Sequence, residues 1–305
     1  IMSQRLDQTV LRAFNNRQAE PPFSAEQLQP FRAFLDEFLL AQGVQPDWSI
    51  PSDQQLCLHI LQQLCLVMHD PDVTLFPYLI AGVPLGIDED IQPSHCFPSN
   101  PPDNPYDPPL LSIHHTNWQS AEDDPDTVQE LIDKEIEAGW VSQFHGTMEE
   151  AQAFFEHGLA VGKLGLALSD SRPPRLVLDS TICGVNPQSR IPEKASLPTA
   201  RDVVRSYPLR ASNRQISGVS FDVKSAHKQM AVNPRYRGHL CFQFKGRIYF
   251  YKVCPFGAVV SAHFWSRLGG AFQRLFHRIC YLPHASFLYV DDLLESIDVS
   301  RNINH

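Results

Sequence analysis

The chain has 305 residues, of which 43% are hydrophobic and 19% are charged, and its formal net charge is −9. This is the composition of an ordinary globular protein. It contains no run of about 18 apolar residues, so no membrane span is expected. Seven cysteines without a CxxC pair argue against a zinc site or a disulfide framework. With no signal peptide at the N-terminus, they indicate reduced thiols in an intracellular protein of the cytoplasm or nucleus.

The net charge hides a segregation along the chain. Residues 1–160 hold 5 basic and 25 acidic residues, residues 161–280 hold 19 and 5, and residues 281–305 hold 1 and 4. A basic segment of this size favours a polyanionic partner. The alternative is that the basic segment packs against the acidic one, and the charge pattern leaves both open.

Two helices are predicted in residues 1–91. Ser24 has the character of an N-cap, and apolar residues follow it at helical spacing. A second helix is expected over 54–68, where Asp70-Pro71 stops the pattern. No catalytic constellation is visible here, so this region is interpreted as an acidic helical region of unknown role.

A proline-rich segment follows. Residues 92–109 contain seven prolines, which predicts a linker or extended strap over 92–112. The remainder of the chain, residues 113–305, is then treated as one further domain.

Helical and strand patterns alternate in that domain. Helices are expected over 126–140, 148–157 and 258–279. Strands are expected on both sides of a turn in 161–185, and over 216–223, 239–244, 247–253, 286–290 and 293–297. Lys245-Gly246 and the paired acids Asp291-Asp292 mark the tips of two predicted hairpins.

The paired acids raise a chemical question. Asp291 and Asp292 interrupt an apolar run, where two like charges are costly to bury unless something binds them. A third acid, Asp222, ends the strand of FDVKSAH (221–227). If the two strands are neighbours, Asp222 and Asp291 face each other, and carboxylates on adjacent strand ends suit two divalent ions for phosphoryl transfer. Each acid alone is more often a solvated turn or a helix cap.

Three motifs in this order resemble those of reverse transcriptases of the retroviral and retrotransposon type. YVDD (289–292) is similar to their YxDD box, FDVKSAH to the first catalytic-aspartate motif, and CPFGAVVSAHFWSR (254–267) to the motif between them. RLVLDSTICGVNPQ and VQELIDKEIEAGWV resemble fingers segments, so the resemblance covers about residues 115–298. It implies an α+β fold of right-hand polymerase fingers and palm, with an antiparallel palm sheet and packed helices, preceded by the mainly helical N-terminal region.

The resemblance also implies roles for single residues. The expected catalytic residues are Asp222, Asp291 and Asp292. The expected ligands of two Mg²⁺ ions, with Mn²⁺ as an alternative, are Asp222, Val223 through its carbonyl, Asp291 and Asp292. The expected nucleotide-binding residues are Lys163, Arg175, Ser225, Ala226, His227, Phe256 and Gly257. The expected primer or template contacts are Tyr289 and Arg267.

Two of these positions depart from the family pattern. His227 stands where the family has a Phe or Tyr that excludes a ribose 2′-hydroxyl. We prefer the interpretation that it is a flat ring with no new chemistry; weaker discrimination against ribonucleotides is the alternative. Ser225 replaces an acid found in many relatives.

The function implied is that of an RNA-directed DNA polymerase domain, a nucleotidyltransferase of a retroelement. Its partners would be an RNA template, a DNA or RNA primer and a dNTP, with no membrane. Only 13 residues follow Asp292, so the thumb is expected to be absent, and a ribonuclease H domain would be a further polyprotein part. Two alternatives stay open: an inactive nucleic-acid-binding remnant, and a protein-interaction module.

Overall fold

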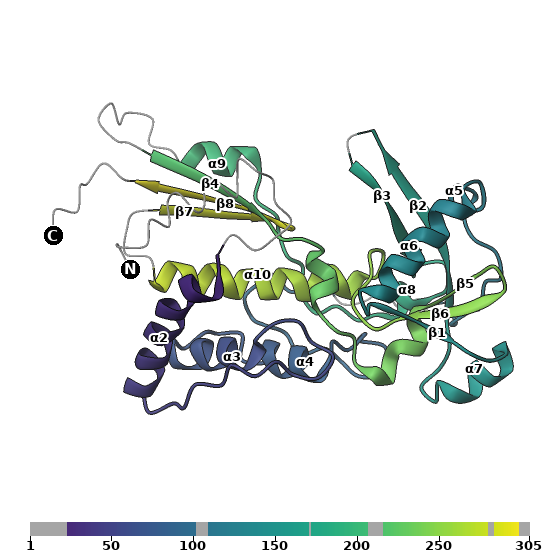
Figure 1. Ribbon diagram of the computed structural model, residues 1–305, viewed down its shortest axis with the longest axis horizontal. Helices are drawn as coiled ribbons and strands as arrows, with labels where there is room; N and C mark the ends of the chain where they lie inside the picture. Colours follow the sequence, from purple (N-terminus) through teal and green to yellow (C-terminus); the bar gives the residue numbers. More distant parts are fainter. Residues whose placement is uncertain (1–22, 102–108, 171, 207–215, 280–283, 299–305) are drawn as a thin grey trace.

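The computed structural model describes residues 23–101, 109–170, 172–206, 216–279 and 284–298, which Figure 1 draws in colour. The longer helices are α2 (Ala25–Ala41), α3 (Leu58–Val67), α4 (Leu75–Ala81), α6 (Pro125–Glu137), α7 (Met148–Phe154), α9 (Ala200–Ser206) and α10 (Val259–Ile279). Short ones are α5 (Gln119–Glu122), α8 (Val185–Gln188) and the 3-10 segments η2 (Ala226–Gln229) and η3 (Pro234–Leu240). The strands are β1 (Val141–Phe144), β2 (Val161–Ser169), β3 (Arg172–Asp179), β4 (Ile216–Asp222), β5 (Cys241–Phe244), β6 (Arg247–Tyr251), β7 (His284–Tyr289) and β8 (Asp292–Asp298).

The described elements form a mixed α and β structure with two sheets, which fits the expected α+β class. One sheet is mixed and has the order β1-β6-β5-β2-β3, with β2 and β5 parallel. The other is antiparallel and has the order β4-β8-β7. In the part of the chain that the structure describes, no helix combines the length and apolarity needed to cross a bilayer.

A local capping motif explains where α2 begins, whereas α3 begins later than predicted. Ser24 Oγ accepts from the Gln27 N–H at 3.3 Å, and Gln27 Oε1 accepts from the Ser24 N–H at 3.0 Å, which completes a capping box. The second helix, α3, starts at Leu58 rather than at the predicted position 54. Gln54 is used elsewhere: its side chain donates to the Leu79 carbonyl at 2.6 Å and accepts from the Ala231 N–H at 3.3 Å.

Helix α10 lies at the centre of the molecule. In Figure 1 the N-terminal helices lie on one side of it and the β4-β8-β7 sheet on the other. A single hydrophobic cluster includes Leu58 and Leu75 from the N-terminal helices together with Phe264 and Leu268 from α10. Since these buried residues share one core, the predicted boundary at residue 91 does not separate two cores.

The proline-rich segment is held along its described part. Glu193 accepts two hydrogen bonds from Ser94, at 2.8 Å from the N–H and 2.6 Å from the hydroxyl, and one from the His95 N–H at 2.6 Å. The Asn100 N–H donates to the Pro192 carbonyl at 2.9 Å. This part contains no helix or strand, as predicted, but it is fastened to the chain around residue 193; residues 102–108 lie outside the described ranges.

Ion pairs join the acidic and basic segments. Among the described residues, seven salt bridges connect a basic residue of 161–280 to an acid of 1–160: Arg190–Asp90, Lys228–Glu135, Arg235–Glu89, Arg237–Asp53, Lys245–Asp126, Arg267–Asp72 and Arg274–Asp70. The acidic segment therefore neutralises part of the basic segment, which is the second of the two interpretations of the charge pattern. Exposed basic residues without a salt bridge in the described part include Arg175, Arg201 and Lys224.

Candidate functional site

Three carboxylates lie at one end of the antiparallel sheet. Asp222 ends β4 and is the register partner of Asp292, which begins β8. Asp291 lies in the turn before β8, and its carbonyl accepts a hydrogen bond from the Val223 N–H at 3.0 Å. The two strands are neighbours as expected, but the residue opposite Asp222 is Asp292 and not Asp291.

The two-residue turn of the hairpin explains this register. Tyr289 pairs with Asp292, so Val290 and Asp291 form the tip. Val290 has a φ of 57°, an unusual value for a β-branched residue. The tip therefore holds Asp291 out of the strand ladder, and Asp292 occupies the paired position.

Strand alternation decides which face the acids occupy. Phe221 pairs with Leu293, and both line a cavity against α10. Asp222 and Asp292 are each one residue away, so their side chains lie on the opposite face. Both acids are exposed, and the side chain of Tyr289 is 55% exposed. The acids thus face away from α10, toward the open side of the sheet.

Helix α10 packs against the β7–β8 hairpin. Trp265 Nε1 donates to the Val290 carbonyl at 2.5 Å. At Gly269 the helix lies so close to β7 that an added Cβ would be 2.1 Å from Leu288 Cδ2. These contacts fix the height of the acidic turn above α10.

A line of side chains leads from the β2–β3 hairpin to the acids. The Arg175 guanidinium carbon lies 5.5 Å from the centre of the Phe256 ring, and Phe256 lies 5.2 Å from the His227 ring, centre to centre. His227 is buried, and burial lowers its pKa below the ordinary value while the nearby Asp291 carboxylate opposes the shift. Three residues predicted to bind a nucleotide thus lie in a row, and His227 at the end of that row is near Asp291.

The loop that carries Phe256 is fixed by its neighbours. The Leu178 N–H donates to the Phe256 carbonyl at 3.1 Å. Gly257 has a φ of 105°, and a Cβ there would be 1.8 Å from the Leu178 carbonyl oxygen. Asn186 completes the support: its Nδ2 donates to the Gly257 carbonyl at 2.7 Å, and its Oδ1 accepts from the Val259 N–H at 2.9 Å. Asn186 therefore supports this loop, a role that the sequence pattern did not predict.

Ser225 and Ala226 form the bend between Asp222 and His227. Ser225 has a left-handed φ of 54°, and Ala226 is 4% exposed. Their backbone turns the chain from β4 into η2, which places His227 beside Phe256.

Lys163 and Arg267 contact other residues. Lys163 is the register partner of Asp179, and its Nζ lies 4.9 Å from the centre of the Trp118 ring. Arg267 is 0% exposed and binds Asp72 through two hydrogen bonds of 2.9 and 2.6 Å. Because its guanidinium does not reach the surface, the predicted primer or template contact of Arg267 is corrected to a structural role.

A buried ion pair between Lys228 and Glu135, next to His227, was not predicted from the sequence. Lys228 follows His227 and binds Glu135 of α6, with both side chains 8% exposed. Its Nζ lies 4.8 Å from the centre of the Trp140 ring and 5.9 Å from that of Phe256. The acid precedes Lys228 by 93 residues, so no local pattern could have paired them.

A cavity of about 490 Å³ adjoins His227 and the acidic turn. Its lining mixes apolar side chains with polar and basic ones: Asn100, Ile191, Glu193, Lys194, Ala195, Leu197, His227, Val259, Ala262, His263, Trp265, Ser266 and Val290. The site therefore has room beside it for a ligand larger than an ion.

No group of three or more His, Cys, Asp or Glu side chains is close enough to hold a metal within the described ranges. Magnesium is nevertheless commonly held by one or two carboxylates together with waters and substrate phosphates. The cross-strand pair Asp222 and Asp292, with Asp291 next to it, is chemically suited to that mode of binding.

Comparisons with known proteins find matches among solved structures. No family model matches the chain, and no curated protein sequence matches it. A crystal structure of the prototype foamy virus protease-reverse transcriptase aligns with a TM-score of 0.42 and 16% sequence identity. The alignment covers 65% of this chain and 22% of that one. A likeness at this level supports no inference about activity.

Proposed function

We propose that this chain is an RNA-directed DNA polymerase domain of a retroelement, which adds dNTPs to a primer 3′-hydroxyl. The observation that carries the proposal is the pairing of Asp222 with Asp292 beside the turn of Asp291. The three acids lie near His227, which contacts Phe256, and Phe256 in turn contacts Arg175.

In the proposed reaction the primer 3′-oxygen attacks the α-phosphorus of the dNTP, and the bond to pyrophosphate breaks. Asp222, Asp291, Asp292 and the Val223 carbonyl would hold Mg²⁺ or Mn²⁺. When bound, such ions activate the attacking oxygen and stabilise the leaving one. Arg175 would bind the triphosphate, since a guanidinium matches phosphate oxygens in geometry and charge.

The other proposed contacts follow from position. Phe256 and the neutral ring of His227 would pack against the incoming nucleotide. Exposed basic residues such as Lys194, Arg201 and Lys224 would contact the phosphates of template and primer. The RNA template would use the cavity beside His227, which Lys194 also lines.

Primer extension on an RNA template with dNTPs and Mg²⁺ tests the proposal. The chain is compared with Asp291→Asn/Asp292→Asn, and with Glu137→Gln/Glu156→Gln as an exposed control that removes the same number of charges. Incorporation that disappears only in the aspartate double variant is the expected result.

Two other outcomes would contradict the proposal. Binding of an RNA–DNA hybrid that weakens steeply with salt, but without incorporation, would assign a nucleic-acid-binding remnant. A change of less than about tenfold in affinity between low and moderate salt would argue against phosphate contacts altogether. The ion pairs that compensate part of the basic segment would then favour the protein-interaction module.

A further inference from the structure

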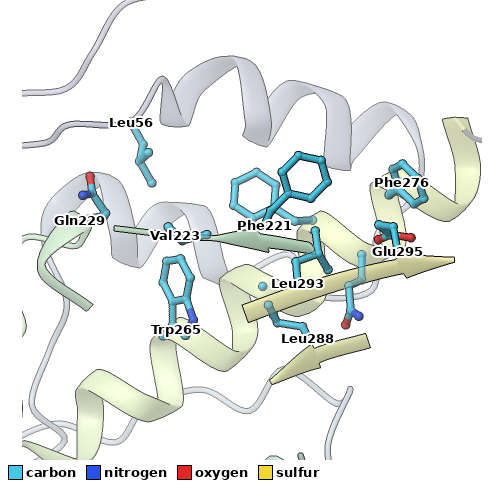
Figure 2. A pocket seen from close by; sticks show the side chains of 12 residues that line it. Leu56, Phe221, Val223, Gln229, Trp265, Phe276, Leu288, Leu293 and Glu295 are labelled. Carbon is cyan, nitrogen blue, oxygen red and sulfur yellow. The ribbon is translucent and has the colours of Figure 1, made fainter. Parts of the chain in front are cut away.

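A second cavity lies between the three-stranded sheet and α10, on the face of the sheet opposite to Asp222 and Asp292 (Figure 2). Its volume is about 590 Å³. Pockets that bind small molecules commonly measure about 300–1,000 Å³. The 12 lining residues are Leu56, Phe221, Val223, Gln229, Trp265, Gly269, Phe272, Gln273, Phe276, Leu288, Leu293 and Glu295.

The wall of this cavity is mainly hydrocarbon and aromatic. Figure 2 shows Phe221 and Leu293 on the strands, with Trp265 and Phe276 on the helix. Two of the aromatic side chains stay in contact with water, since Phe221 is 48% and Phe272 is 39% exposed. An apolar ligand that covered them would gain about 25 cal/mol for each Å² removed from water.

One carboxylate interrupts the apolar wall. Glu295 is 4% exposed, and its Oε1 accepts a hydrogen bond from the Ser286 hydroxyl. Gln273 Nε2 donates to the same hydroxyl at 3.3 Å. The second oxygen, Glu295 Oε2, is buried and has no hydrogen-bond partner in the described part of the molecule. A buried carboxylate oxygen without a donor is unfavourable. A ligand that brings a hydrogen-bond donor or a positive charge to Glu295 would therefore be stabilised in this cavity.

We propose that this cavity binds a small, mostly apolar molecule that carries a protonated amine. The apolar body would fill the space between Phe221, Trp265 and Phe276. The ammonium group would give Glu295 its missing donor, after rotation of the carboxylate about its last bond. Aromatic rings also attract cations, which favours an amine over a neutral donor. The site is separate from the open face of the acids and does not depend on the proposed polymerase function.

Binding of two matched probes to the full 305-residue chain tests the proposal. 4-Phenylbenzylamine is a cation at neutral pH and 4-phenylbenzoate is an anion with a similar apolar body. Isothermal titration calorimetry and thermal melting measure affinity and stabilisation. We expect the amine to bind at least tenfold more tightly than the acid and to raise the melting temperature.

Variants locate the binding. Glu295→Gln keeps the shape of the side chain and should reduce the preference for the amine at least fivefold, whereas Glu137→Gln removes an exposed charge on α6 and should leave it unchanged. Leu293→Trp, or Leu56→Trp from the other end of the cavity, should abolish binding of both probes.

Each remaining outcome overturns a defined part of the proposal. Equal binding of amine and acid would refute the role of Glu295. Binding that survives both tryptophan variants, or no binding at millimolar probe, would refute the site, and the apolar wall would then suit a protein segment. If the variants do not fold, the comparison of the two probes on the unaltered chain still decides the charge preference.

Discussion

Arg267 and Asp72 form a two-point ion pair across 195 residues of sequence, with Nε 2.9 Å from Oδ2 and Nη2 2.6 Å from Oδ1. The two side chains are 0% and 1% exposed. Two turns further along α10, Arg274 binds Asp70 in the same way, at 2.7 and 2.9 Å. The short connection between α3 and α4 is thus clamped to α10 by two arginines.

The first prediction concerns this clamp. Asp72→Asn or Arg267→Met alone leaves a buried charge without its partner and should cost about 3–5 kcal/mol of the free energy of unfolding. The double variant should lose less than the sum of the two, because neither charge remains. Urea unfolding followed by circular dichroism measures this. The exposed pair Arg190–Asp90 is the control, and its removal should cost less than about 1 kcal/mol; equal costs for the two pairs would contradict the prediction.

The second prediction concerns Gly257. Gly257→Ala would combine a strained φ of 105° with a Cβ placed 1.8 Å from the Leu178 carbonyl oxygen. We expect a loss of more than about 3 kcal/mol, or failure to fold, since backbone must move. Gly246→Ala is the matched control: its φ is 73°, but no atom lies within 4 Å of the added Cβ. It should cost only about 1 kcal/mol, and similar losses at both positions would show that the close approach of Leu178 does not matter.

The third prediction is a pH dependence of stability. Burial, and then the nearby Arg267, lower the pKa of His263 from 6.5 to about 4. Between these values the unfolded chain binds a proton that the folded chain does not. Stability is therefore full above about pH 6.5, decreases as the pH falls toward 4, and loses up to roughly 3 kcal/mol from this group.

His263→Gln should flatten that decrease, whatever its effect at neutral pH. His145→Gln is the control, because His145 is exposed. Urea unfolding at several pH values between 4 and 7.5 measures the slope for each protein. Identical slopes for His263→Gln and the unaltered chain would show that His263 is not the titrating group.

The fourth prediction concerns Lys228 and Glu135. Lys228→Met and Glu135→Gln should each destabilise the chain by about 3 kcal/mol or more, because each leaves a buried partner unpaired. Lys228→Met/Glu135→Met should recover much of that loss. Thermal melting compares the three variants. A double variant no more stable than the single ones would contradict the prediction. It would mean that the aromatic rings around Lys228 are stabilised by its positive charge.

Sequence patterns predict the regular elements well where the period is clear. The apolar stripe of 258–279 became α10 (Val259–Ile279), and Lys245-Gly246 forms a hairpin turn with φ of 46° and 73°. Helix α4 was missed because LFPYLIA is apolar throughout and contains a proline, so no helical period is visible. Short elements of this kind are decided by packing.

The sequence predicted that the strands carrying the three acids are neighbours, but it did not predict their register. Spacing and motif singled out Asp222, Asp291 and Asp292, and the strands that carry them are neighbours. Which acid faces Asp222 depends on a two-residue turn with a positive φ at Val290, which no pattern indicated. The burial of Arg267 depends on a partner 195 residues away, and local sequence carries no trace of such a contact.

The two sheets are interleaved along the chain. Strand β4 of the antiparallel sheet lies in sequence between β3 and β5 of the mixed sheet, and β7 and β8 come last. During synthesis on the ribosome β4 therefore emerges long before its partner β8, and it must wait with an unpaired edge. For the same reason no cut between residues 216 and 251 yields a piece that contains either sheet whole. Dissection of this protein into separately expressed halves should succeed only if both halves are present together.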